Sequence, residues 1–123
     1  MRAPSEIELL GIWESGLARH PIDRALLLCS WARPDLPDDS FARLPIGVVN
    51  VTLLGMRDLL FGPEIQLQVR CEECGERLEV GLPIARLLAD AEKGEVRRGV
   101  DIGGYRFRVP DSRDLASVAG EVV

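Results

Sequence analysis

Two cysteines that could bind a metal ion stand close together in the stretch VRCEECGERLEV, residues 69–80. Cys71 and Cys74 are separated by two residues, and Gly75 follows the second cysteine. Thiolates at this spacing form the knuckle typical of zinc ribbons, in which a tight turn directs backbone N–H groups at the sulfurs. Glycine suits this turn because it adopts a positive φ without steric cost. The spacing therefore predicts half of a metal site at Cys71 and Cys74.

The other half of such a site is hard to find in the sequence, because a structural zinc ion takes four ligands. Cys29 lies in an apolar helical segment, where a buried small side chain is the more ordinary interpretation. His20, the single histidine, is interpreted as a residue near the negative end of a helix dipole. Glu72, Glu73 and Glu76 would make an unusual zinc-ligand set. The pair is thus either a relic knuckle or a half-site, and zinc is expected only if another chain or missing sequence completes it.

A dithiol redox site is a further interpretation of the cysteine pair. Thioredoxin-like motifs lie between a strand and a helix, whose dipole lowers the thiol pKa. Strands are predicted on both sides of this pair, and the intervening Glu72 and Glu73 are expected to raise the thiol pKa. The pattern therefore favours the knuckle.

The cysteines are expected to lie at the turn of a β-hairpin. EIQLQVR, residues 64–70, alternates apolar and polar side chains, and ERLEVGL, residues 76–82, returns in the same way. A second hairpin is predicted over residues 95–110, with its turn at Gly103 and Gly104. Arg106 and Arg108 share one face of that hairpin. This face is interpreted as solvated, or alternatively as a partner-binding edge.

Helices are predicted before, between and after the hairpins. The first spans residues 5–19 behind a capping box of Ser5 and Glu8. The second begins near Pro21, the third covers about 45–60, a short helix starts at Pro83, and a closing helix is capped by Asp111 or Ser112.

The predicted fold class is α+β: N-terminal helices followed by two β-hairpins, with a zinc-ribbon-like knuckle in the first, and short helices. Residues 1–62 form the helical part and residues 63–123 the hairpin and knuckle part with its closing helix, together one folding unit. The helices and hairpins are expected to share one core. Its buried side chains are predicted to include Trp13, Leu27, Trp31, Leu54, Leu60, Leu67 and Val80.

Composition and charge exclude several classes of function. The chain has 123 residues and a net charge of -5, which disfavours non-specific binding to nucleic acid or an anionic membrane. No apolar run approaches the roughly 20 residues that span a bilayer, and the N-terminus lacks a secretory pattern. A cytoplasmic protein with reduced thiols is expected. With one histidine and no phosphate-binding loop, no catalytic residues are assigned and no enzyme activity is expected.

Three stretches, in this order, resemble one family of small proteins: IELLGIWESGLARHPIDRALLLCSWARPDL, MRDLLFGPEIQLQVRCEECGERLEV and YRFRVPDSRDLASVAG. The chain is similar to the baseplate hub assembly chaperones of contractile-tailed phages and tail-like injection systems. The matching positions span nearly the whole chain. They are Trp13–Glu14, Pro21 with Asp23–Leu26, Leu60–Gly62, Cys71 with Cys74–Glu76, Arg108–Pro110 and Ser112–Leu115.

The resemblance implies a non-enzymatic assembly factor or adaptor whose partners are baseplate or hub proteins. Similar proteins carry a second Cys-x-x-Cys-Gly and a tryptophan-rich helical tail beyond the point at which this chain ends, at Val123. The resemblance therefore implies a shortened member, with no complete metal site of its own.

The alternative is a zinc-ribbon-like nucleic-acid-binding module. Residues 63–123 carry nine basic and twelve acidic side chains, whereas a nucleic-acid-binding face normally has a basic excess. Neither a nucleic-acid partner nor a membrane is expected.

Overall fold

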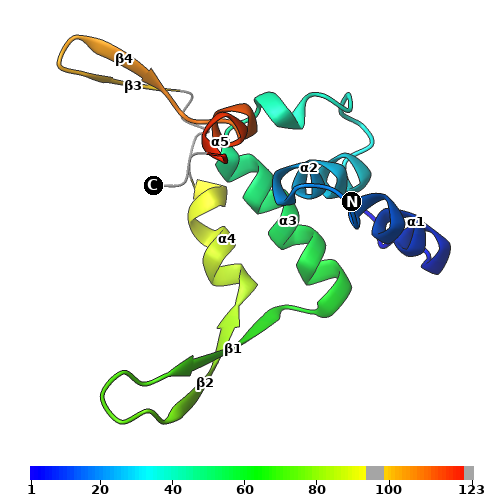
Figure 1. The fold of residues 1–123 in the computed structure, drawn as a ribbon, viewed down its shortest axis with the longest axis vertical. Helices are drawn as coiled ribbons and strands as arrows, with labels where there is room; N and C mark the ends of the chain where they lie inside the picture. Colours follow the sequence, from blue (N-terminus) through cyan, green and yellow to red (C-terminus); the bar gives the residue numbers. More distant parts are fainter. Residues whose placement is uncertain (94–98, 121–123) are drawn as a thin grey trace.

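The computed structural model describes residues 1–93 and 99–120, and it confirms the predicted α+β class. Three N-terminal helices come first: α1 (Glu6–Gly16), α2 (Pro21–Ala32) and α3 (Ile46–Phe61). A short 3-10 helix, η1 (Phe41–Arg43), lies between α2 and α3. Figure 1 shows these helices as one body from which two hairpins extend.

Each hairpin is a separate two-stranded antiparallel sheet. β1 (Glu64–Arg70) pairs with β2 (Arg77–Pro83), and β3 (Gly99–Ile102) pairs with β4 (Tyr105–Arg108). Residues 95–98 of the predicted second hairpin lie outside the described residues. Gly103 and Gly104 have φ values of 58° and 81°, as a two-residue turn with positive φ at both positions requires.

One helix follows each hairpin and returns the chain to the helical body. α4 (Ile84–Lys93) packs against α3, and Ile84 at its start is buried. α5 (Ser112–Val118) packs against η1 and α2. The helical body therefore includes residues from both ends of the chain (Figure 1).

The core centres on Cys29, Phe41 and Val49, which are almost completely buried. Half-buried apolar side chains from α2, α3 and the α2–α3 connection pack around them: Ala25, Leu26, Leu36, Leu44 and Leu53. Cys29 is inaccessible to solvent, which confirms its interpretation as a small core residue. The core thus joins α2, η1 and α3.

The prediction that the hairpins share this core is wrong. Leu67 and Val80 are 40% and 48% exposed, and Trp13 on α1 is 66% exposed. Leu27, Trp31, Leu54 and Leu60 are half-buried. The reason is geometric, since the two-stranded sheets extend beyond the helices (Figure 1), and no second layer formed by residues 1–93 or 99–120 covers their apolar faces.

The start of each capped helix follows from local chemistry. Ser5 and Glu8 form the predicted capping box at α1, in which Ser5 N donates to Glu8 Oε2 at 2.8 Å. His20 was expected near the end of a helix, but it caps the start of α2, where its Nδ1 accepts from Ile22 N at 3.3 Å. Pro21, at the first position of α2, has no N–H to satisfy, so the chain can turn directly from α1 into α2.

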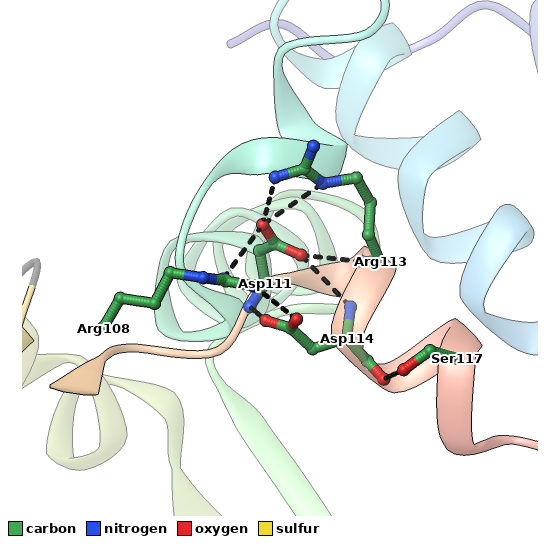
Figure 2. A network of polar contacts seen from close by, with 5 residues as sticks. All are labelled: Arg108, Asp111, Arg113, Asp114 and Ser117. Carbon is green, nitrogen blue, oxygen red and sulfur yellow. Dashed lines mark hydrogen bonds and ion pairs between the residues drawn. The ribbon is translucent and has the colours of Figure 1, made fainter.

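An ion-pair network around Asp111 links the start of α5 to the end of β4 (Figure 2). The buried Asp111 carboxylate accepts from Arg113 Nη2 at 2.7 Å and from Arg108 Nη1 at 3.3 Å. It also caps α5 by accepting from the backbone N–H groups of Arg113 and Asp114. Asp114 completes the box by accepting from Asp111 N at 2.9 Å. Next to it, Ile46 N donates to Pro110 O at 3.1 Å and links this corner to α3.

Acid should weaken this corner of the fold. The hydrogen bond from the Arg113 side chain, together with those from the Asp114 and Arg113 backbone, lowers the pKa of Asp111 to about 2. An unfolded aspartate has a pKa of about 3.9. The stabilisation is therefore complete above that value and is lost as pH falls toward 2. Urea denaturation across this pH range should show a smaller loss of stability in Asp111→Asn than in the wild type.

The matched control for this experiment is Asp101→Asn. Asp101 and its ion-pair partner Arg106 are both exposed, at a distance of 3.7 Å, and such a pair contributes little to stability, so the variant should lose stability in acid as the wild type does. If Asp111→Asn loses stability in acid as steeply as the wild type, the network does not contribute as described.

Substitution of a buried and of an exposed phenylalanine, Phe41 and Phe61, tests the position of the core. Phe41 is 1% exposed and Phe61 is 76% exposed. Phe41→Ala should lower the free energy of unfolding by about 3–5 kcal/mol because it leaves a cavity. Phe61→Ala should change it by no more than about 0.5 kcal/mol. Denaturant unfolding of both variants measures the difference, and equal losses would place the core elsewhere.

Candidate functional site

Cys71 and Cys74 lie in the six-residue loop that joins β1 to β2. Cys71 N donates to Glu76 O at 2.8 Å, and Gly75 N donates to Cys71 O at 2.9 Å. Gly75 has a φ of 73°, the left-handed conformation expected at this position. The loop thus closes into a tight turn with the hydrogen bonding of a metal-binding knuckle.

Backbone groups surround the sulfur of Cys71. Hydrogen bonds from Cys74 N and Glu73 N, and one involving the Cys74 side chain, lower the pKa of the Cys71 thiol. The expectation that neighbouring glutamates raise this pKa is therefore wrong for Cys71. The backbone N–H groups of the turn lie close to the sulfur and stabilise its negative charge. Glu72, Glu73 and Glu76 are exposed to solvent, which screens their effect on the pKa of Cys71. The turn therefore stabilises the thiolate form of Cys71 relative to that of a free cysteine.

The other candidate ligands do not approach the knuckle. Cys29 lies in the core, where its Sγ is 3.7 Å from Val49 O, and burial raises the pKa of its thiol to about 11. His20 uses Nδ1 to cap α2. Among the described residues, no three histidine, cysteine or acidic side chains are gathered as a metal site requires. The knuckle therefore offers two ligands, at the far end of the first hairpin.

Both hairpins carry an exposed row of apolar side chains on one face. In the first hairpin Leu67 faces Val80 and Val69 faces Leu78, and all four are 40–53% exposed. In the second, Val100 faces Phe107 and Ile102 faces Tyr105, and these are 48–73% exposed. We refer to these two sets as the first and second ladders. A hairpin with one uncovered apolar face is marginally stable by itself.

A third apolar surface runs along α1, where the sequence predicted that Trp13 would be buried. Ile7, Leu10, Trp13 and Leu17 are 57–84% exposed, and their spacing places them on one side of the helix. We refer to these four residues as the α1 stripe. Sequence periodicity finds such a face but cannot say whether the same chain covers it.

The opposite side of α1 borders an open groove against α2. Its volume is about 780 Å³, and its lining includes Ile12, Leu27 and Trp31. Arg2 lies over the Trp31 ring with its guanidinium carbon 5.4 Å from the centroid and forms an ion pair with Glu8. The groove combines an aromatic wall with a polar rim, which suits an apolar side chain of a partner.

The two arginines of the second hairpin are paired with aspartates of the hairpin and of the segment that follows it. Arg106 lies 3.7 Å from Asp101, and Arg108 pairs with Asp111 and Asp114. The shared face of Arg106 and Arg108 is therefore partly neutralised. No helix within residues 1–93 or 99–120 has both the length and the apolar character needed to cross a bilayer.

Comparison with known proteins adds no relative. No family model, curated protein or solved structure matches this chain.

The two kinds of cysteine should react differently with an alkylating reagent. Cys71 is accessible and its pKa is lowered, so its alkylation rate should reach half its maximum below the pH of about 8.5 typical of free cysteine. Cys29 should stay unmodified until the chain unfolds. Peptide mapping by mass spectrometry after timed iodoacetamide labelling measures both. A half-maximal pH for Cys71 at or above that of free cysteine would contradict the proposed turn.

The hairpin should survive the loss of its cysteines. Its strands are joined by a full register from Glu64–Pro83 to Arg70–Arg77, so backbone pairing along the whole length of the strands supports it independently of the cysteines. The double variant Cys71→Ser, Cys74→Ser should unfold within about 5 °C of the wild type in the presence of a chelator. Calorimetry that shows a much larger loss would mean that the thiols themselves hold the fold together.

Proposed function

We propose that this chain is a non-enzymatic assembly factor or adaptor for the baseplate of a contractile tail, and that it acts in the cytoplasm through protein–protein contacts. One observation carries the contact role: the α1 stripe and both ladders leave large apolar side chains uncovered. Extended exposed apolar surfaces of this kind mark interaction sites in soluble proteins.

The α1 stripe is the strongest of the three surfaces. It presents Trp13 between Leu10 and Leu17, and tryptophan is enriched among the residues that dominate binding energy. An amphipathic helix binds by laying such a row into an apolar groove of its partner. The capping box at Ser5 and Glu8 fixes the start of this helix, so the stripe is formed in advance and binding costs less ordering.

The tail assignment rests on the sequence resemblance. The matching positions include Trp13 and the Cys71–Cys74 pair, so they fall on the α1 stripe and the knuckle. They also include Arg108 and Asp114, which belong to the network that holds α5. The proposed partners are therefore baseplate or hub proteins of a contractile tail, with no nucleic acid and no membrane involved.

The charge distribution disfavours nucleic-acid binding. The arginines of the second hairpin pair with aspartates, and exposed glutamates surround the knuckle. A phosphate backbone would meet repulsion at the metal-binding turn. Protein partners would not meet this electrostatic repulsion at the ladders or the stripe, because these surfaces are apolar.

The proposal is tested by co-expression with the baseplate and hub proteins encoded beside the gene for this chain. We expect a stable complex with one of them, and Trp13→Ala should weaken it by roughly 30-fold, as truncation of a central tryptophan does. Phe61→Ala is the matched control, since Phe61 is an aromatic residue outside the stripe and is 76% exposed, against 66% for Trp13. Isothermal titration calorimetry measures both variants.

Two outcomes would overturn the proposal. One is the absence of sheath, tube and baseplate genes beside this one together with no binding to any tail protein. The other is tight, salt-sensitive binding of DNA or RNA by the purified chain, which would favour the zinc-ribbon-like module instead.

A further inference from the structure

We infer that one Zn²⁺ ion can join two copies of this chain, held by Cys71 and Cys74 of each copy. The inference concerns the knuckle alone and does not depend on the tail function. It commits to a second copy of this chain as the source of the missing ligands.

The first argument is the shape of the turn. Cys71 N and Gly75 N are both used inside the loop, in bonds of 2.8 Å and 2.9 Å to Glu76 O and Cys71 O. These two backbone hydrogen bonds close the loop around its cysteines. Two thiolates held this way form half of a tetrahedral Cys₄ site, the set that thiophilic Zn²⁺ prefers in structural positions.

The second argument is the ligand count. The described part of the chain offers no third ligand at the knuckle, because Cys29 is in the core and His20 caps α2. Four ligands are required. Two identical halves related by a two-fold axis supply four thiolates and form a closed pair, which is the commonest symmetry of protein assemblies.

The third argument is access. The knuckle lies at the end of a hairpin that extends away from the helices (Figure 1), and Cys74 is exposed. Two such ends can meet without contact between the helical bodies. The first ladder begins directly behind the knuckle with Val69 and Leu78, which are 53% and 48% exposed, so a facing copy would cover part of an open apolar surface.

The fourth argument is charge. Arg70 and Arg77 face each other in the last strand pair before the knuckle, and like charges in this position destabilise a hairpin. Neither arginine forms an ion pair within the described residues. Zinc binding releases four thiol protons to solvent and leaves a centre with a net charge of about -2. Two arginine pairs beside that centre would offset its charge.

Exposed acids at the same turn oppose association. Glu72, Glu73 and Glu76 of one copy would approach those of the other. Because these side chains are solvated, their repulsion is screened over about 8 Å at physiological ionic strength. The test is therefore made at that salt concentration.

The experiment follows mass and metal together. The reduced chain is freed of metal with a chelator and titrated with ZnCl₂, while light scattering after size exclusion gives the mass and elemental analysis gives the zinc. We expect the mass to double, with completion at one zinc per two chains, and to return to one chain when chelator is added. Co²⁺ in place of Zn²⁺ should give tetrahedral thiolate absorption that saturates at the same ratio.

Variants identify the ligands. Cys71→Ser with Cys74→Ser should abolish the doubling, whereas Cys29→Ala, which removes the remaining cysteine, should retain it. The reversal by chelator uses the wild-type chain, so the test does not depend on the folding of any variant. The inference is overturned by one zinc per monomer, by a pair that persists in chelator, by no zinc uptake, or by doubling in the double cysteine variant.

Discussion

The buried core of this protein is small, and its position among the helices determines which surfaces stay exposed. Within the described residues, the fully buried apolar side chains belong to α2, η1, α3 and the first residue of α4: Cys29, Ala32, Phe41, Val49, Met56 and Ile84. None comes from a hairpin. Since apolar burial supplies most of the driving force for folding, the helices hold the structure together, and the hairpins depend on their attachment to them.

The uncovered surfaces follow from this constraint. A two-stranded sheet has one apolar face and no second layer, so each ladder stays open unless another molecule covers it. The same holds for the α1 stripe, because α1 contacts α2 through its other side. The knuckle, with Cys71 and Cys74, adds a polar end to the first of these surfaces. Contacts with another molecule would therefore bury apolar surface that the isolated chain leaves open.

Local chemistry made much of the fold predictable. The capping box at Ser5, the strict alternation of residues 64–70 and the glycine at position 75 each determine their structure through near neighbours.

Other features could not be read from the sequence. Phe41 was missed because a single-turn helix has no periodicity to detect. The shared core was wrongly predicted because alternation shows which face of a strand is apolar and does not show what covers it. Trp13 was predicted to be buried for a similar reason, because the sequence shows the apolar face of a helix and does not show what covers it. The lowered pKa of Cys71 was missed since it depends on backbone N–H directions set by the turn.

The central claim is that the hairpins lie outside the core of the isolated chain and keep their apolar faces open. Amide hydrogen exchange of the metal-free monomer tests it most directly, because protection follows the free energy of local opening. We expect the amides of α2 and α3 to exchange slowly, through global unfolding, and those of β1–β2 and β3–β4 to exchange orders of magnitude faster through local opening. Hairpin amides as well protected as those of α2 would contradict the account, since the ladders would then be covered by the chain itself.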